Sequence, residues 1–255
     1  MIILVFLAKT SSSNEWKVVA NTISTLVEEA TFEATAEGLT FRAMDPSHVA
    51  LVDLVWPNSA FDKYDCDKQL KLTVRVEDLV KLIRRADVKD NIEISMGEDE
   101  TLLLKLANGY ERRFQIHLID STYGATPVPK LTFNAKIEIT EQIFEKMLND
   151  ISAVSDHIMI TTNNEKLVFS GKSDSGSGSA TLEKGNQELL QLKVKEDSKA
   201  TYSIDYLLNI TKAASKSTDI LTFEYSNKMP LRLTFKLGEK GGQMQFYLAP
   251  RIEEK

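Results

Sequence analysis

Two stretches of the chain repeat the same pattern of apolar and polar positions. They are DLVKLIRRADVKDN at 78–91 and DYLLNITKAASKSTD at 205–219, and Leu79 in the first corresponds to Leu207 in the second. Apolar residues at i, i+3 and i+7 form one stripe in each stretch, which predicts two short amphipathic helices that pack onto a core. Because a repeat of this length indicates duplicated structural units, we expect two copies of one fold.

The spacing of apolar positions predicts the same order of elements in each half of the chain. In the first half we expect a loop at 61–66, helices at 15–30 and from 77, and strands at 2–8, 31–35, 38–43, 48–56, 69–74, 91–96, 101–106 and 110–118. In the second half we expect helices at 140–154 and 205–219, and strands at 132–139, 157–161, 166–171, 177–183, 187–194, 199–203, 220–225, 231–236 and 243–248. Thr140 stands where it can cap the N-terminus of the third helix. The predicted fold class is therefore α+β.

The segment IDSTYGATPVPKL at 119–131 differs in character from both halves. It contains two prolines, a glycine and several small residues. Proline fixes its own backbone and favours an extended conformation in the residue before it. We interpret this segment as an interdomain connector, between an N-terminal domain at 1–118 and a C-terminal domain at 132–255.

The distribution of charge matters more than the net charge. The formal net charge is −6 and the pI is about 5.3, which argues against nucleic-acid binding by the surface as a whole. Basic residues nevertheless gather on the helix faces opposite the apolar stripes, while acidic residues concentrate at 62–67, at 97–100 and at the C-terminus. Such a face can contact phosphates without reading base sequence. For either helix alone, a plain solvated face is the alternative.

Cysteine content and apolar runs bear on the compartment. Cys66 is the single cysteine, so no disulfide can form within the chain, and a reducing intracellular compartment fits. The apolar run at 2–8 is too short to span a membrane and lacks the flanks of a signal peptide. We therefore expect a cytoplasmic protein with no membrane partner.

The sequence does not indicate catalysis, a metal site or a cofactor. The three histidines, His48, His117 and His157, lie far apart and form no pair with metal-ligand spacing. The sequence GKS at 171–173 ends like a phosphate-binding loop, but Lys166 occupies the position that requires glycine. No nucleophile elbow or catalytic triad stands out. We expect no enzyme activity, no metal and no cofactor.

Four segments together resemble one known family. The sequence FRAMDPSHVALVD at 41–53 closely resembles the strand–turn–strand signature of the DNA sliding clamps of archaea and eukaryotes, the proliferating cell nuclear antigen family. RRFQIHLID at 112–120, NKMPLRLTF at 227–235 and FYLAPRIEEK at 246–255 are similar to later segments of that family. The resemblance covers essentially the whole chain, includes the duplication and looks archaeal in style. It implies a ring of three identical subunits around duplex DNA, with helices lining the interior and antiparallel sheets outside.

The resemblance implies that residues of the helix faces contact DNA without sequence preference. We call the following the DNA-contact residues: Lys17, Lys81, Arg84, Arg85, Lys146, Lys212 and Lys216. The first helix is less basic than is usual in the family, and the loop of three serines before it resembles a small insertion.

The resemblance also implies how the ring closes. Edge strands of neighbouring subunits pair antiparallel, here the strand at 110–118 with the strand at 175–184 of the next subunit. We call the following the interface residues: Tyr110, Arg112, Arg113, Phe114, Ile116, Ser177, Ser179, Thr181 and Glu183. Glu183 would lie opposite Arg112 and Arg113 and add charge complementarity. Edge strands protected only by charge are the alternative.

Partner proteins of the family insert a short peptide motif, often called a PIP box, into an apolar pocket. The motif is a glutamine, then an aliphatic residue, then two aromatic residues. The resemblance implies that DNA polymerase, clamp loader, flap endonuclease and DNA ligase bind in this way. We call the following the peptide-pocket residues: Met44, His48, Val49, Val128, Pro230, Tyr247, Ala249 and Pro250. Ordinary core packing is the alternative for Met44, Val49 and Tyr247.

The function implied by the resemblance is that of a replication processivity factor, opened by an ATP-driven clamp loader. Three alternatives stay open. The chain could be one subunit of a heterotrimeric clamp, whose edge strands would not pair with themselves. It could be a nucleic-acid-processing enzyme, although no clustered carboxylates support this. It could be an interaction scaffold that does not contact DNA.

Overall fold

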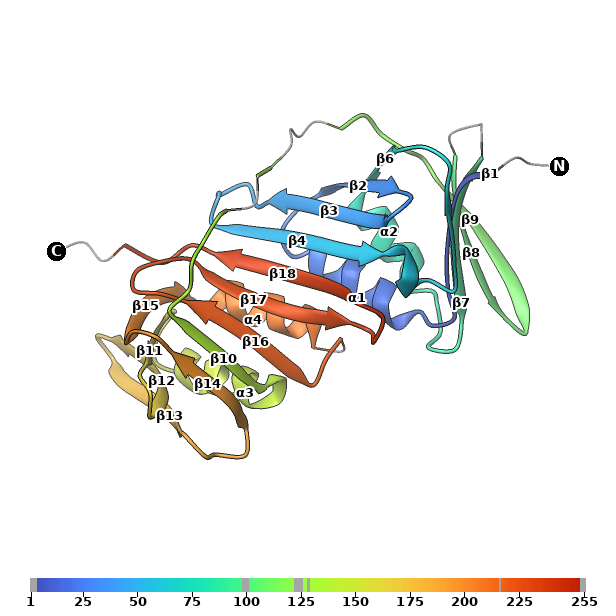
Figure 1. The fold of residues 1–255 in the computed structure, drawn as a ribbon. Coiled ribbons are helices and arrows are strands. Elements are labelled where there is room, and N and C mark those ends of the chain that lie inside the picture. The colour runs from blue at the N-terminus through green and yellow to red at the C-terminus, as the bar shows by residue number, and fades with distance from the viewer. Residues whose placement is uncertain (1–3, 98–100, 122–125, 128, 216, 253–255) are drawn as a thin grey trace. The chain divides into compact units, whose positions relative to one another are not determined.

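The computed structural model describes residues 4–97, 101–121, 126–127, 129–215 and 217–252 (Figure 1). The chain forms two compact units. The first contains Met1–Pro46, Val52–Pro127 and Lys236–Met244, and the second contains Ser47–Leu51, Val128–Phe235 and Gln245–Lys255. Each unit therefore has its own set of packed elements.

The first half of the chain contains two helices among short strands. Its elements are β1 (Leu4–Thr10), α1 (Asn14–Ile23), β2 (Glu29–Thr35), β3 (Gly38–Met44), β4 (Ala50–Pro57), a 3₁₀ turn at Asn58–Ala60, β5 (Lys63–Cys66), β6 (Leu70–Arg75), α2 (Val76–Ile83), β7 (Asn91–Gly97), β8 (Leu102–Asn108) and β9 (Tyr110–Ile116). One antiparallel sheet has the order β5-β1-β7-β8-β9. Strand β2 pairs antiparallel with β3 on one side and with β6 on the other.

The core of the first unit follows from the periods of its elements. In β2 every second residue is buried, including Phe32, because side chains alternate across a strand. Helices α1 and α2 bury one face each and contact one another. Trp16 of α1 packs against Trp56 at 4.7 Å between ring centroids, and Trp56 packs against Phe61 at 4.8 Å. Two helices are thus fixed side by side over the strands.

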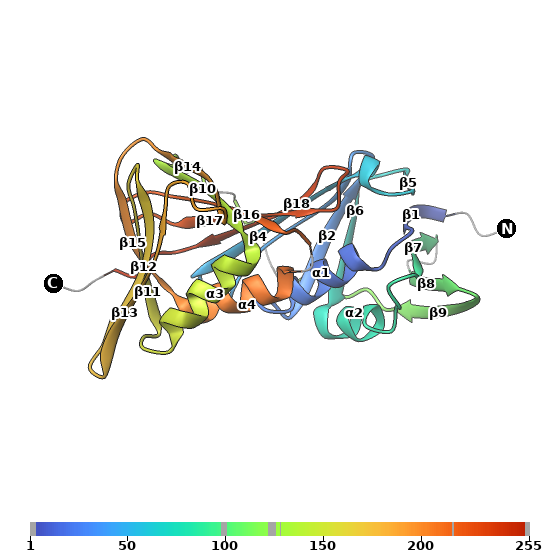
Figure 2. The ribbon, with the colours of Figure 1, turned by 90° about the horizontal axis from the view of Figure 1, so that it is seen from below.

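The second half repeats this plan. Its elements are β10 (Ala135–Thr140), α3 (Glu141–Ser152), β11 (His157–Thr162), β12 (Lys166–Ser173), β13 (Gly176–Glu183), β14 (Leu189–Val194), β15 (Ser198–Ser203), α4 (Ile204–Ala214), β16 (Ile220–Tyr225), β17 (Leu231–Leu237) and β18 (Gly242–Leu248). One antiparallel sheet has the order β13-β12-β11-β15. Strand β10 lies between β14 and β16, and β16 also pairs with β17. Helices α3 and α4 contact one another, and α3 packs on β12 and β13 (Figure 2).

The duplicated α+β fold is confirmed. Along the described residues, each half reads strand, helix, five strands, helix, three strands, with one additional 3₁₀ turn in the first half. The sheet neighbours also correspond, because β5-β1-β7-β8 in the first half matches β14-β10-β16-β17 in the second. The two amphipathic stretches that revealed the repeat are α2 and α4.

Several predicted boundaries are wrong. The first helix ends at Ile23 rather than at residue 30, because the backbone N–H groups of Leu26 and Val27 both turn back to the Ile23 carbonyl. Helices α2 and α4 end at Ile83 and Ala214, well short of 91 and 219. The predicted loop at 61–66 contains strand β5, which pairs with β1.

Two single residues also differ from prediction. Thr140 occupies the N-cap position of α3, but its hydroxyl donates to Oε2 of Glu188 and makes no capping hydrogen bond. His48 was expected to begin a strand, but its φ is 57° and β4 begins at Ala50. A left-handed backbone interrupts strand geometry, so the turn extends two residues further than predicted.

The described part of the connector has no regular secondary structure, and the described residues contain neither a membrane-spanning helix nor a metal-binding group. The described residues of 119–131 form no helix or strand, and the Thr126 carbonyl accepts a hydrogen bond from Nη1 of Arg42 at 3.4 Å. Within the described part of the chain, no helix is long and apolar enough to cross a membrane. The same residues hold no group of three or more His, Cys, Asp or Glu side chains arranged to bind a metal ion.

Candidate interaction surfaces

The first unit presents cations at the end of α2. Lys81 is exposed on the helix and pairs with Glu77 one turn earlier, with 2.6 Å between Nζ and Oε1. This hydrogen bond raises the pKa of Lys81 and lowers the pKa of Glu77. Arg84 and Arg85 are exposed just after the helix ends. An exposed pair of this kind is weakly held, so Lys81 can exchange Glu77 for a phosphate.

Arg84 connects the two helices of the first unit. Its Nε and Nη2 atoms lie 3.3 and 3.2 Å from Oδ1 of Asn21 on α1. Lys17, also on α1, is half-buried. The structure therefore places Arg84 over the junction of α1 and α2, while Lys17 is the least accessible of the DNA-contact residues it describes.

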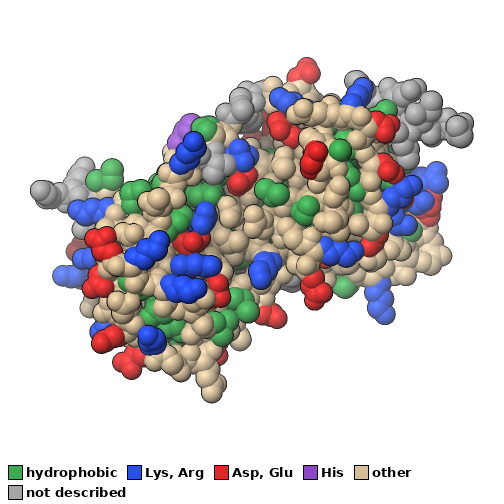
Figure 3. All heavy atoms as spheres, in the orientation of Figure 1, with side chains coloured by type: hydrophobic (Ala, Val, Ile, Leu, Met, Phe, Trp, Pro, Cys, Tyr) green, Lys and Arg blue, Asp and Glu red, His purple; other side chains and the backbone are tan. Residues whose placement is uncertain are grey.

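The second unit presents exposed cations on its own helix pair. Lys146 on α3 and Lys212 on α4 are both exposed, and neither forms an ion pair with any residue that the structure describes. Lys216 lies outside the described residues. On the face shown in Figure 3, by contrast, acidic and basic side chains are interspersed over the strands. Each helix pair, taken by itself, thus offers cations that a polyanion can neutralise.

A buried ion pair supports the loop after α2, and sequence reasoning missed it. Nη2 of Arg112 on β9 lies 2.5 Å from Oδ2 of Asp90, and Nη1 of the same guanidinium donates to the Arg85 carbonyl at 2.8 Å. The side chain of Asp90 is fully buried and also accepts the backbone N–H of Asp87. Arg112 therefore holds the loop that carries Arg84 and Arg85. The only sequence signal was an arginine and an aspartate far apart, which is too weak to pair them.

Strands β9 and β13 are both edge strands. Each is the last strand of its sheet, with β8 and β12 as the respective neighbours. Tyr110 on β9 is 66% exposed, and Phe114 is half-buried on a strand that has no second neighbour among the described residues. Arg112 is bonded to Asp90, and Arg113 is bonded to the exposed Glu111 at 2.6 Å. The charge pairing of these two arginines with Glu183 of a neighbouring subunit stays a prediction.

Strand β13, the edge strand of the second unit, is rich in small residues. Strand β13 has the sequence GSGSATLE, and a Cβ atom at Gly178 would lie 3.2 Å from Cγ2 of Val154, just beyond the end of α3. Ser177, Ser179, Thr181 and Glu183 are exposed and share the other face of the strand. The residues that follow α3 lie so close to β13 that position 178 favours glycine. The opposite face of β13 is exposed and polar.

The structure brings some of the peptide-pocket residues together. In the second unit, the backbone N–H of Ala249 donates to the Val49 carbonyl at 2.8 Å. Tyr247 is buried, Pro230 and Pro250 are half-buried, and His48 is exposed in its tight turn. Val128 lies outside the described residues, and Met44 belongs to the first unit. The C-terminal segment therefore runs beside the turn at His48 and Val49.

Comparison with known proteins identifies the family. The family model described as "Proliferating cell nuclear antigen, N-terminal domain" matches residues 5–121, and the model described as "Proliferating cell nuclear antigen, C-terminal domain" matches residues 127–251. Together they account for nearly the whole chain. The chain belongs to the proliferating cell nuclear antigen family, as the resemblance implied.

Individual relatives agree with this assignment. The chain is 47% identical to a protein named DNA polymerase sliding clamp from Cenarchaeum symbiosum, over 98% of this chain and 99% of that protein. It is also 47% identical to the protein of the same name from Nitrosopumilus maritimus, over 98% of this chain and all of the relative. A crystal structure of the family member from Thermococcus kodakaraensis matches with a TM-score of 0.91 at 25% identity, covering 96% of this chain and 100% of that one.

Proposed function

We propose that the protein is a DNA polymerase sliding clamp, a processivity factor that encircles duplex DNA as a homotrimeric ring. The observation that carries the proposal is that relatives bearing this name match the chain from end to end, while the two family models match its two halves. In this proposal the protein has no catalytic activity and needs no cofactor. It works inside the cell, on the chromosome, and its domains are 1–118 and 132–255, joined by the connector 119–131.

The exposed cations of the helix pairs suit sliding. Lys81, Arg84, Arg85, Lys146 and Lys212 can each neutralise a phosphate, and such contacts carry no base information. A clamp that bound bases tightly would stop moving. Loose contact with phosphates instead lets a closed ring remain on the duplex while its position changes.

Ring closure is proposed to use the two edge strands. Strand β9 of one subunit would pair with β13 of the next, which satisfies backbone N–H and C=O groups that lack partners at a sheet edge. The half-buried Phe114 would then lose its remaining contact with water. This arrangement uses one kind of subunit three times.

Partner proteins are proposed to dock through the glutamine–aliphatic–aromatic motif at the peptide-pocket residues. DNA polymerase, flap endonuclease and DNA ligase are the expected partners, and an ATP-driven clamp loader opens the ring. Tethering raises the effective concentration of an enzyme at the DNA, so it rebinds before it diffuses away.

The first test measures association with nicked circular DNA. The double charge reversal Arg84→Glu with Lys212→Glu should lower association at least about tenfold near 0.1 M salt. The control Lys193→Glu with Lys195→Glu makes the same change in net charge at exposed positions on or beside β14 and should have little effect. Full association by the first variant would instead favour an interaction scaffold that does not contact DNA.

The second test measures solution mass by light scattering. A homotrimer should have about three times the chain mass of 28.7 kDa. A chain that stays monomeric at high concentration would favour a subunit of a heterotrimeric ring.

A further inference from the structure

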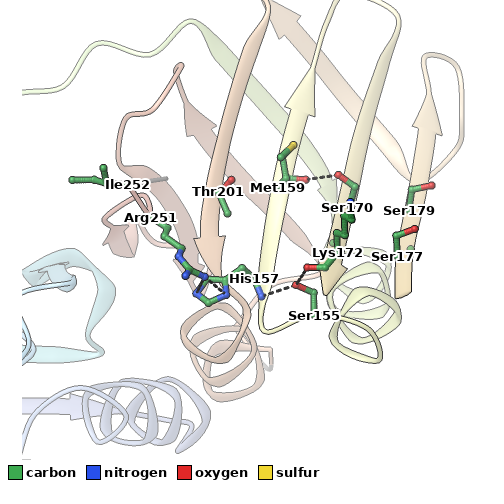
Figure 4. Close-up of a pocket in the computed structure, with 12 residues that line it drawn as sticks. Ser155, His157, Met159, Ser170, Lys172, Ser177, Ser179, Thr201, Arg251 and Ile252 are labelled. Carbon is green, nitrogen blue, oxygen red and sulfur yellow. Dashed lines mark hydrogen bonds between the residues drawn. The ribbon is translucent and has the colours of Figure 1, made fainter. Parts of the chain in front are cut away.

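A groove lies on one face of the sheet β13-β12-β11-β15 in the second unit (Figure 4). Its volume is about 1040 Å³. The residues that line it are Ser155, His157, Met159, Ser170, Gly171, Lys172, Ser177, Gly178, Ser179, Thr201, Arg251 and Ile252. It is therefore formed by four strands and the C-terminal segment.

The strand register places hydroxyl groups in a row across this face. Met159 on β11 lies opposite Thr201 on β15 and opposite Ser170 on β12, and Ser170 lies opposite Ser179 on β13. Residues directly opposite one another in a sheet point to the same side. Lys172 and Ser177 form the next pair on that side. The groove thus presents hydroxyl groups from several strands, of which that of Ser170 donates to the Met159 carbonyl.

The charge of the lining differs from that of the chain. The whole protein has a net charge of −6, yet among the described residues the lining contains Lys172, Arg251 and His157 and no aspartate or glutamate. Ammonium, guanidinium and hydroxyl groups all donate hydrogen bonds to carboxylates, and the charged donors make the stronger bonds. The chemistry that fits this lining is an anion.

Arg251 is held at the end of the groove by two contacts. Its backbone N–H donates to the Thr201 carbonyl at 2.7 Å, and Nη1 lies 2.7 and 2.9 Å from the two ring nitrogens of His157. Burial, and then the charge of Arg251, lower the pKa of His157, which favours a neutral ring that accepts from the guanidinium. Asp156 and Asp205 act on this pKa in the opposite direction, but neither lines the groove.

The groove lies next to the proposed peptide site along the chain, and this indicates what kind of ligand occupies it. Ala249 and Pro250, two of the peptide-pocket residues, directly precede Arg251, and all three belong to the second unit. Among the described lining residues the one aromatic ring is that of His157, which lies against the Arg251 guanidinium, so the groove offers no Phe, Tyr or Trp platform on which a nucleic-acid base can stack. These features favour a peptide over a nucleic acid.

We infer that the groove binds an acidic segment that flanks the docking motif of a partner protein. The inference rests on the proposed function, because it extends the proposed peptide site. Lys172 and Arg251 would each pair with a carboxylate of that segment, and the hydroxyls of Ser177 and Ser179 would donate to the remaining oxygens. The motif would provide apolar anchoring, and the acidic flank would select among partners.

The experiment uses labelled synthetic peptides and the full chain, with binding read by fluorescence anisotropy. Four peptides carry the motif: one with an uncharged glycine–serine flank, two with a tetraglutamate flank before or after the motif, and one with a tetralysine flank. A fifth carries tetraglutamate without the motif. At least one motif peptide with glutamates should bind about three- to tenfold more tightly than the uncharged one, because a few exposed ion pairs add modest affinity.

Variants of groove residues, with control variants outside the groove, test whether the glutamate flank gains its affinity from the groove. Lys172→Gln alone, and together with Arg251→Gln, should remove the gain while leaving the uncharged peptide bound as before. Lys193→Gln with Lys195→Gln removes two exposed lysines outside the lining and should keep the gain. The single Lys172 variant changes only an exposed side chain, so it also tests the groove if Arg251→Gln disturbs the C-terminal segment.

The outcomes separate the two proposals. If the uncharged motif peptide fails to bind, the proposal that partners dock through the motif is wrong. In that case, binding of the tetraglutamate peptide that depends on Lys172 would still support binding of an acidic segment in the groove. If the uncharged peptide binds and neither glutamate flank adds affinity, or if the gain survives Lys172→Gln, the inference is overturned. A gain from the lysine flank, or displacement of the acidic peptide by single-stranded DNA at lower concentration, would overturn it too.

Discussion

Glu141 begins α3 with its side chain almost completely buried. The residue is 8% exposed, and its Oε1 atom has no hydrogen-bond partner among the described residues. Burial raises the pKa of this carboxyl to about 7, and the charges of Glu145 and Asp219 add to the effect. The ionised form is thus disfavoured in the folded protein, so ionisation should cost stability near neutral pH.

The variant Glu141→Gln tests this at the residue scale. In the folded chain the raised pKa keeps Glu141 protonated while the unfolded chain ionises, so wild-type stability falls as pH rises from the ordinary carboxyl range through about 7. The variant should match wild type near pH 4 and be about 1–2 kcal/mol more stable near pH 8, by urea unfolding. Glu165→Gln, at an exposed turn, is the control and should follow wild type throughout.

A second residue-scale prediction concerns Arg112. Removing it by Arg112→Ala leaves the fully buried Asp90 without its cation, and breaking such a pair costs about 3 kcal/mol. Chemical unfolding measures the loss. The neighbouring Arg113→Ala removes an exposed guanidinium and should change stability by less than about 0.5 kcal/mol. Equal effects of the two variants would contradict a structural role for the Arg112–Asp90 pair.

At the scale of elements, Phe114 on β9 tests ring closure. Phe114→Ala should shift the chain towards monomers at low micromolar concentration, because burying the rest of this ring contributes about 1 kcal/mol at each interface. Light scattering over a dilution series measures the shift. Glu111→Gln, on the exposed face of the same strand, should leave the oligomer unchanged. Loss of monomer stability without a change in mass would remove Phe114 from the proposed interface.

Element types were predictable from sequence where one period dominates. The predicted stripe of α4 and the alternation of β2 match the buried positions, whereas in α2 Ile83 is buried and Leu82, three residues after Leu79, is half-buried. Helix ends were not predictable, because buried residues of a following turn and strand, such as Leu26 and Ala30, continue the helical spacing by coincidence. Strand β5 was missed for the opposite reason, since KYDC has no buried residue and depends on pairing with β1.

At the scale of the whole molecule, contacts between distant segments were hidden from sequence reasoning. The Arg112–Asp90 pair joins a strand to a preceding loop, and the groove lining comes from four strands and the C-terminal segment. Neither set has a spacing that any periodicity could reveal. The exposed helix cations, in contrast, were recognisable because they oppose an apolar stripe in both repeats.

Salt should separate the kinds of binding proposed for the molecule. Raising salt from about 0.05 to 0.2 M should weaken association with a short linear duplex, whose free ends allow a ring to leave, by at least about tenfold, with a linear relation between the logarithms of affinity and salt, because counterions are released. Binding of the uncharged motif peptide should change less than about twofold, since apolar burial is barely screened. Salt-independent DNA association would contradict contact through the helix cations.

Strand β5 ends at Cys66, the single cysteine of the chain. One dye attached to this thiol marks each chain once, so the chains in an oligomer can be counted. Burial raises the pKa of the thiol, and Sγ lies 3.1 Å from the Lys68 carbonyl, so a maleimide dye should attach slowly near neutral pH and faster at higher pH. A fully labelled homotrimer should then bleach in three steps under single-molecule illumination, one for each subunit. A ring that holds this chain once, beside cysteine-free partners, should bleach in one.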